Sequence, residues 1–147
     1  MNKLQLLSSL KEKGFSNQIL DAFEKVPREN FISFQIRNHA YEDTALSIGN
    51  GQTISQPYTI AKMLEMLELK NGQKVLEVGS GCGYVLALLS EIIREKGKVY
   101  GIEIIKELAE NSRDNLKNYN NIEVYNKSGI NGLEEKAVVA TAELGVR

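Results

Sequence analysis

Apolar residues recur every three or four positions in the first part of the chain. This pattern predicts an amphipathic helix around Leu10 that ends at Gly14. A second helix, around Ile19, is expected to end near Pro27. Residues 28–56 then show no sustained period. So long a connection without a pattern is unusual in a compact domain, and we expect a functional or mobile loop there.

Strands and helices alternate in the rest of the chain. Pro57 opens a third helix, and from residue 74 onward short apolar runs alternate with helical segments. The expected strands are 74–78, 98–103 and 122–126, and the expected helices between them are 85–97 and 105–119. This alternation is typical of parallel βαβ units with right-handed crossovers. The predicted fold is therefore α/β, with a Rossmann-like parallel sheet of about three to four strands and an N-terminal helical cap, because residues 137–142 (AVVATA) could add a short fourth strand.

Composition and charge exclude several classes of protein. A chain of 147 residues with 42% hydrophobic residues has enough apolar surface for one domain. Acidic and basic residues mix along the chain at a net charge of −1, so no basic region points to nucleic acid. The single cysteine excludes an internal disulfide, which fits a reducing compartment. The N-terminal residues are amphipathic, so we expect neither a signal peptide nor a membrane span, and a cytoplasmic location.

The first candidate chemistry lies in a glycine-rich turn, residues 79–83 (GSGCG), which follows a predicted strand and opens a helix. Glycines there let the backbone turn sharply and approach a ligand. The G-x-G-x-G spacing differs from the G-x-G-x-x-G of pyrophosphate binders. Glu103 lies 24 residues after Gly79, where a carboxylate can accept hydrogen bonds from both ribose hydroxyls. The combination favours a nucleoside without a pyrophosphate, commonly S-adenosylmethionine, over a plain tight turn beside a solvated glutamate.

A second candidate is Ser55, which precedes Pro57 in the stretch GQTISQPY. Proline suits the first position of a helix, and polar side chains just before it often cap free amides. On this pattern alone, capping is favoured for Ser55 over contact with a substrate. We expect His39, the only histidine, at the surface or in a cap rather than in catalysis. Cys82 is expected to be a small turn residue rather than a nucleophile.

Longer motifs make the chain similar to a known family. The run AYEDTALSIGNGQTISQPYTIAKMLEMLELKNGQKVLEVGSGCGYVLALLSEI resembles the protein-L-isoaspartate O-methyltransferases, a family of repair enzymes. VPRENFI before it and KVYGIEIIKELAENSRDNLKNY after it are also similar to segments of that family. The similarity covers nearly everything from Val26 to about Ala137. Many methyltransferases share the glycine motif, whereas YED…IG.GQTISQP is specific to this family.

The resemblance implies a class I methyltransferase fold and a reaction. A methyl group would pass from S-adenosylmethionine, leaving S-adenosylhomocysteine, to the free carboxyl of an L-isoaspartyl or D-aspartyl residue in a damaged protein. The family's active-site serine falls on Ser55, so substrate contact replaces capping as our prediction for its hydroxyl. The implied substrate-binding residues are Thr53, Ile54, Ser55 and Gln56. The implied cofactor-binding residues are Gly79, Ser80, Gly81, Gly83, Glu103, Ile104, Ser128 and Gly129, and no metal site is expected.

The resemblance also implies an organisation. We expect one domain over residues 1–147, with helices and a substrate-side loop in 1–56 and a partial cofactor-binding portion in 57–147. Residues 41–43 (YED) could rim the peptide site or form a solvated loop. Residues 127–129 (KSG) stand where the family usually has G-D-G, which removes a charge from the adenine site. The chain ends soon after the third strand of the sheet, and we expect a C-terminally truncated member of the family.

Three functions stay open from the sequence. The chain could be the repair methyltransferase, a methyltransferase-like module that binds S-adenosylmethionine with little or no turnover, or a methyltransferase for another acceptor. Because later strands of the family are absent, we expect weak cofactor binding and slow or no methylation. The expected partners are proteins and peptides with isoaspartyl or D-aspartyl residues, and neither nucleic acid nor a membrane. If AVVATA fails to pair, the first strand of the sheet becomes an exposed edge that favours self-association.

Overall fold

Five α-helices lie in the part of the chain that the structure describes. The structure, a computed structural model, describes residues 1–130, 132 and 139–142. The α-helices of these residues are α1 (Lys3–Glu12), α2 (Asn17–Lys25), α3 (Pro57–Met66), α4 (Tyr84–Ile93) and α5 (Lys106–Asn115).

Residues close in sequence set both ends of α1. Before α1, the Asn2 side chain accepts the Gln5 amide and the Gln5 side chain accepts the Asn2 amide. Gly14, at φ +88°, follows the last turn as predicted.

The predicted parallel sheet is confirmed. Its strands are β3 (Lys74–Val78), β4 (Lys98–Ile102), β5 (Ile122–Tyr125) and β6 (Val139–Ala142), in the order β5-β4-β3-β6. All neighbours are parallel, and β6 lies within the segment AVVATA, so the possible fourth strand is present. Because β6 pairs with β3 from Val75 to Val78, β3 is not the exposed edge that an unpaired AVVATA would leave.

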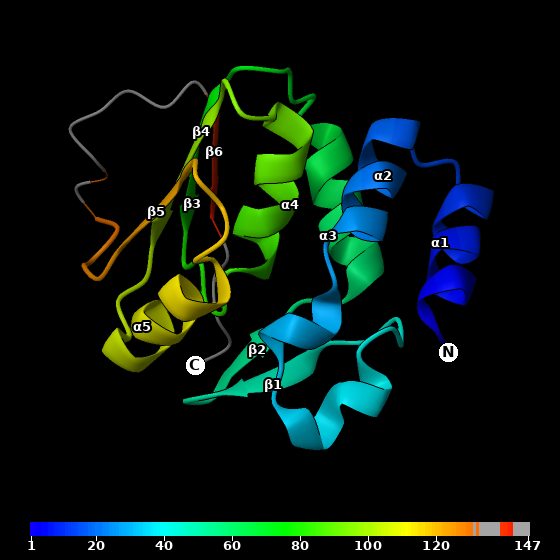
Figure 1. Cartoon of the computed structure of the whole chain (residues 1–147), viewed down its shortest axis with the longest axis horizontal. Helices are drawn as coiled ribbons and strands as arrows, with labels where there is room; N and C mark the ends of the chain where they lie inside the picture. Colours follow the sequence, from blue (N-terminus) through cyan, green and yellow to red (C-terminus); the bar gives the residue numbers. More distant parts are fainter. Residues whose placement is uncertain (131, 133–138, 143–147) are drawn as a thin grey trace.

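The helices form layers beside this sheet (Figure 1). α4 packs on β4 and β5, α2 packs on α4, and α1 and α3 pack on α2. Nine of the ten residues of α4 are buried, which fits a helix with neighbours on almost every side. α4 ends at Ile93, earlier than the predicted residue 97, because Arg94 takes a φ of +63°. α5 likewise ends at Asn115 rather than at residue 119.

Residues 28–56 are not the structureless loop that the missing period suggested. They contain the 3₁₀ helices η1 (Arg28–Phe31) and η2 (Phe34–His39) and the antiparallel strands β1 (Leu46–Gly49) and β2 (Gln52–Ile54). The hairpin turns at Asn50 and Gly51, with φ of +55° and +69°. Asn-Gly is the strongest short hairpin signal because both positions need positive φ. That dipeptide could have revealed the hairpin from the sequence alone.

One hydrophobic core joins the helices to the sheet. A single buried cluster runs from Leu6 in α1 through α2, α3 and α4 to Val75 and Val99 in the sheet. A smaller cluster on the opposite face of the sheet contains Leu76, Tyr100 and Ile102. Alternate residues of β3 and β4 thus face different sides, as the pleat of a strand requires. The larger cluster holds the N-terminal helices and the hairpin at fixed positions relative to the strands.

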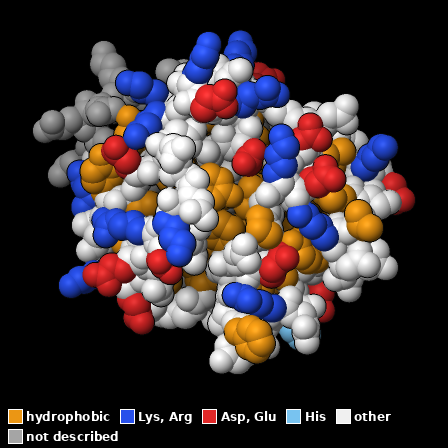
Figure 2. All heavy atoms as spheres, in the orientation of Figure 1, with side chains coloured by type: hydrophobic (Ala, Val, Ile, Leu, Met, Phe, Trp, Pro, Cys, Tyr) orange, Lys and Arg blue, Asp and Glu red, His pale blue; other side chains and the backbone are white. Residues whose placement is uncertain are grey.

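The surface carries charges of both signs. In the view of Figure 2, lysines and arginines alternate with acidic residues, and apolar side chains show between them. None of the helices that the structure describes is long and apolar enough to cross a membrane.

Candidate active site

The glycine turn forms at the carboxyl end of β3. Gly79, Gly81 and Gly83 have φ of +80°, +55° and +90°, a region that other residues enter only with strain. The amides of Gly79 and Ser80 both donate to the carbonyl oxygen of Ile102, at 2.7 and 3.1 Å. The turn is therefore fastened to the end of β4. Its backbone lies at the carboxyl edge of the sheet, where ligands of open α/β folds bind.

The side chain of Ser80, in this turn, is buried. Its Oγ is buried and makes no hydrogen bond among the described residues. A Cβ added to Gly101 in β4 would lie 2.9 Å from that oxygen, so the hydroxyl packs tightly against the strand. The Ser80 hydroxyl is therefore held against β4, and a role of Ser80 in cofactor binding stays a prediction.

Glu103 follows β4 and faces the same turn. The residue is only 5% exposed, and its carboxylate accepts the Gly81 amide through Oε1 at 2.9 Å and the Ile105 amide through Oε2 at 2.8 Å. An ionised carboxylate has about four acceptor sites, so capacity for further donors remains. Asn126, which the sequence did not single out, donates to the carbonyl oxygens of Glu103 and Ile104 at 3.0 and 3.1 Å. The side chain of Ile104 is 58% exposed beside this carboxylate.

Ser128 and Gly129 reach the same edge from β5. A Cβ on Gly129 would lie 2.4 Å from Cγ1 of Val78, so this segment lies directly against the end of β3. Only glycine allows so close an approach. The Ser128 hydroxyl accepts the Ile130 amide at 3.3 Å, which turns it toward its own backbone. The sequence-predicted cofactor residues are thus gathered at the ends of β3, β4 and β5.

The hairpin brings the T-I-S motif to the glycine turn. A small cavity of about 10 Å³ is bounded on one side by Thr53, Ile54 and Ser55 and on the other by Ser80 and Gly81, together with Ile48, Cys82, Tyr84 and Val85. Cδ1 of Ile48 in β1 would lie 3.2 Å from a Cβ on Gly81, so the hairpin packs on the turn itself. Gln56 does not line this cavity, and its Oε1 accepts a hydrogen bond from the Thr59 hydroxyl at 3.4 Å.

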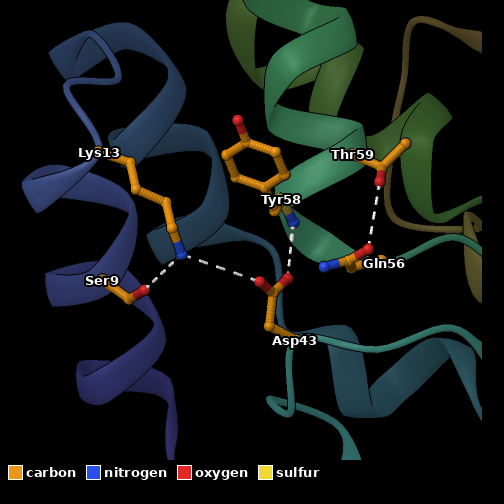
Figure 3. A network of polar contacts seen from close by, with 6 residues as sticks. All are labelled: Ser9, Lys13, Asp43, Gln56, Tyr58 and Thr59. Carbon is orange, nitrogen blue, oxygen red and sulfur yellow. Dashed lines mark hydrogen bonds and ion pairs between the residues drawn. The ribbon is translucent and has the colours of Figure 1, made fainter.

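A residue other than Ser55 caps α3. The N-cap position is Gln56, and the first free amide, that of Tyr58, donates to Oδ1 of Asp43 at 2.8 Å (Figure 3). Lys13 at the end of α1 lies 4.0 Å from Oδ2 of Asp43 and 5.3 Å from the centre of the Tyr58 ring. Asp43 therefore supplies the cap from outside the local sequence. This geometry disfavours the capping alternative for Ser55.

The other residues of the YED motif also have partners inside the chain. The Tyr41 hydroxyl donates to Oε2 of Glu29, and burial and this carboxylate raise the pKa of Tyr41 above its ordinary value. Glu42 pairs with Nδ1 of His39 at 2.8 Å, and both side chains are exposed. His39 thus lies at the surface, as expected. Cys82 is buried in the turn, where its carbonyl oxygen accepts the Asn115 amide group at 3.1 Å.

The comparison with known families decides the family of this chain. The model of the protein-L-isoaspartate(D-aspartate) O-methyltransferase family matches residues 1–142. The chain belongs to this family. Among curated members, it is 48% identical over 128 residues to protein-L-isoaspartate O-methyltransferase 2 of Archaeoglobus fulgidus, covering 86% of this chain and 58% of that protein. It is 46% identical over 134 residues to the enzyme of Ignicoccus hospitalis, covering 88% and 64%.

Solved structures of family members share the fold. One protein-L-isoaspartate O-methyltransferase superposes with a TM-score of 0.89 at 30% identity, covering 96% of this chain and 47% of that chain. A putative member from Plasmodium falciparum, solved with S-adenosyl-L-homocysteine, gives 0.77 at 28% identity and covers 92% and 66%. The class I methyltransferase fold expected from the sequence is thereby confirmed. The chain spans about three fifths of the length of the curated relatives it matches.

Proposed function

We propose that this chain is a protein-repair methyltransferase that moves a methyl group from S-adenosylmethionine to the free carboxyl of L-isoaspartyl or D-aspartyl residues. The observation that carries the proposal is the cavity that the T-I-S motif and the glycine turn line together. It brings the candidate substrate residue within reach of the candidate cofactor site. The names of the family and of its relatives support this chemistry.

The residues present fit a bound S-adenosylmethionine. The positive-φ turn exposes backbone rather than side chains, which suits close approach of a ligand. The Glu103 carboxylate is held by two amides and can still accept the ribose hydroxyls. The exposed apolar side chain of Ile104 suits a flat base, and Ser128 offers a hydroxyl where the family has a carboxylate. The solved relative that holds S-adenosyl-L-homocysteine supports this assignment.

The proposed reaction does not require the protein to transfer a proton. Bound S-adenosylmethionine supplies an electrophilic methyl group on a positively charged sulfur. The substrate carboxyl has an ordinary pKa of about 4 and is already ionised near neutral pH, so no general base is needed. The chain has to hold the attacking carboxylate oxygen in line with the sulfur–methyl bond and keep water out of the site. This is catalysis by proximity and orientation. The surface position of His39 is consistent with such a mechanism.

Ser55 is proposed to orient the substrate. It is half-buried at the end of β2, beside Ile54, and lines the cavity next to the glycine turn. A hydroxyl there can donate to one oxygen of a carboxylate and leave the other free to attack. Thr53, which is exposed, and Gln56 flank Ser55 and are proposed to contact the peptide around the isoaspartyl residue.

The proposal is tested with the purified 147-residue chain. Methyl transfer to an isoaspartyl peptide is measured beside transfer to the same peptide with a normal aspartyl residue, and calorimetry measures S-adenosylmethionine binding. Methylation of the isoaspartyl peptide alone supports the proposal. Binding without transfer to either peptide would favour the non-catalytic module, and transfer to other acceptors only would favour a different methyltransferase.

Substitution of Ser55 tests its role directly. Ser55→Ala should lower the rate of methyl transfer about tenfold or more while cofactor affinity stays close to native, because it removes the hydroxyl proposed to orient the carboxylate and leaves the glycine turn unchanged. Ser47→Ala, in the neighbouring strand β1, is the matched control and should keep the rate. If Ser55→Ala instead lost about 1 kcal/mol of stability and kept its turnover per folded molecule, the hydroxyl would have a structural role.

The partners and place of action follow the same proposal. Proteins and peptides with isoaspartyl or D-aspartyl residues are the proposed partners, and the cytoplasm is the proposed location because one cysteine fits a reducing compartment. Self-association is proposed through an exposed sheet edge at β5, which ends the order of the described strands on one side. Light scattering at several concentrations tests it, and a constant monomer mass would contradict it.

A further inference from the structure

The side chain of a buried arginine donates hydrogen bonds to both ends of the hairpin segment. Arg28, at the start of η1, is 0% exposed. Its Nη2 donates to the carbonyl oxygen of Ser55 at 2.9 Å and to that of Thr44 at 3.3 Å. Nη2 carries two hydrogens, so each carbonyl can receive one. Since Thr44 and Ser55 flank β1 and β2, a single nitrogen closes the base of the segment that ends in the T-I-S motif.

The same guanidinium contacts the start of α4. The Arg28 Cζ lies 5.1 Å from the centre of the Tyr84 ring, and Tyr84 directly follows Gly83 of the glycine turn. Phe31 of η1 packs on that ring at 5.4 Å between centroids. Arg28 therefore bridges the proposed substrate loop and the first residue after the proposed cofactor turn. A planar guanidinium suits this position because it can stack on a ring and donate in its plane at once.

Core stability alone does not explain a cation at this position. Burial lowers the pKa of Arg28 below its ordinary value, and the nearby Tyr84 partly offsets this. Nε and Nη1 make no hydrogen bond among the described residues, and no carboxylate of those residues forms an ion pair with the guanidinium. An apolar side chain of similar volume would fill such a space at lower cost. What the arginine adds is the fixed distance between two carbonyls and one ring.

We propose that Arg28 is a positioning residue that sets Ser55 relative to the glycine turn. The inference rests on the proposed function of Ser55. With Arg28 in place, the backbone carbonyl of Ser55 cannot move away from α4, so its hydroxyl stays beside the cavity. Without it, the base of the hairpin can open while the sheet and the turn keep their own hydrogen bonds.

Arg28→Lys separates geometry from charge. A lysine keeps the cation but lacks the fork that serves two carbonyls and a ring together. In the folded variant, kcat for isoaspartyl peptide should fall about ten- to a hundredfold, while the Kd for S-adenosylmethionine stays at its native value. Arg37→Lys is the matched control. It makes the same change at an exposed arginine of η2, whose guanidinium lies 5.5 Å from the centre of the exposed Phe34 ring and which does not line the cavity, so kcat should not change.

A double-mutant cycle tests whether Arg28 acts through Ser55. If it does, Arg28→Lys should cause no further loss of rate in a chain that already carries Ser55→Ala. A native kcat in Arg28→Lys, or a full additional loss in the double variant, would overturn the inference. Loss of cofactor affinity in parallel with rate would also overturn it, because Arg28 would then support the turn rather than Ser55.

Amide hydrogen exchange gives a readout that does not depend on activity. In Arg28→Lys, amides of residues 44–56 should exchange about tenfold faster, while those of α4 keep their protection. If Arg28→Lys does not fold, Arg28→Gln, which keeps an amide donor, takes its place. Unchanged protection of residues 44–56 would overturn the inference. If the native chain transfers no methyl group, the proposed function fails, and the exchange experiment still decides whether Arg28 holds the loop.

Discussion

The sheet segment 74–125 and the segment 28–56 reach order by different routes. In the sheet segment, each strand and helix has its own pattern of apolar residues within a few positions. The strands β3, β4 and β5, which follow one another in the sequence, are also neighbours in the sheet. In segment 28–56, the elements are short, and the contacts that hold them join residues far apart in the sequence, such as Arg28 with Thr44 and Ser55. Asp43 of this segment likewise caps α3, which begins 14 residues later. The comparison shows that the proposed cofactor site depends on local backbone geometry and the proposed substrate site on distant contacts. The substrate side should therefore be the one that single distant substitutions displace.

The largest effect is expected where the sheet segment depends on one glycine. Gly83→Ala places a Cβ at φ +90° and 2.8 Å from Cδ1 of Leu116, so it combines backbone strain with a clash against the residue that directly follows α5. We expect a loss of about 2–4 kcal/mol in the free energy of unfolding, measured by urea denaturation. Gly72→Ala is the control, since its φ is +85° but no atom lies within 4 Å. Its expected loss is about 1 kcal/mol. Equal losses would show that the contact with Leu116 is unimportant.

Glu103 tests how closely the turn and the proposed cofactor site are linked. Glu103→Ala removes the proposed ribose acceptor and the partner of the Gly81 and Ile105 amides. S-adenosylmethionine binding should weaken by about 1.5–3 kcal/mol, the usual scale for hydrogen bonds to a charged group. Titration calorimetry on the folded variant measures this, with Glu110→Ala on the exposed side of α5 as control. Native affinity in Glu103→Ala would refute the ribose assignment.

Asp43 tests the dependence of the substrate side on a distant cap. Asp43→Ala leaves the Tyr58 amide of α3 without its acceptor, and we expect a loss of about 1 kcal/mol in thermal unfolding. Glu42→Ala, at the preceding residue, removes only an exposed pair with His39. It should lower the free energy of unfolding by less than about 0.5 kcal/mol. If the two variants are equally stable, the cap does not hold α3.

The smallest effect is expected at the exposed end of the sheet. The Tyr125 hydroxyl and Lys98 lower the pKa of Glu123 below 4.5. A lowered folded pKa gives stability above the unfolded pKa that is lost as the pH falls through the folded value. Because the pair is exposed, Glu123→Gln should cost only a few tenths of a kcal/mol at neutral pH. The difference from the native chain should vanish in acid, and a difference that grows below pH 4.5 would contradict this sign.

Most of the fold could be predicted, and part of the site. The strand 74–78 was predicted with its observed bounds, and the helices after it were predicted too long at their C-terminal ends. The predicted site residues come together at one edge of the sheet, although Gln56 does not line the cavity and the Ser80 hydroxyl is buried. The hairpin was missed although Asn50-Gly51 signals it, because its strands are too short to establish a period.

The sequence by itself determined the parallel sheet, the glycine turn and the position of Glu103. The sheet follows from the period of the apolar residues, the turn from the positive φ that glycine allows, and the position of Glu103 from its spacing after the turn. Each of these signals lies within a short stretch of the sequence. Only the tertiary structure decided that Asp43 caps α3, that Ile48 packs on Gly81 and that Arg28 joins Ser55 to Tyr84. Those contacts connect residues far apart in the chain, and no periodic pattern encodes them. They exist because the shared core brings the helices, the hairpin and the sheet together.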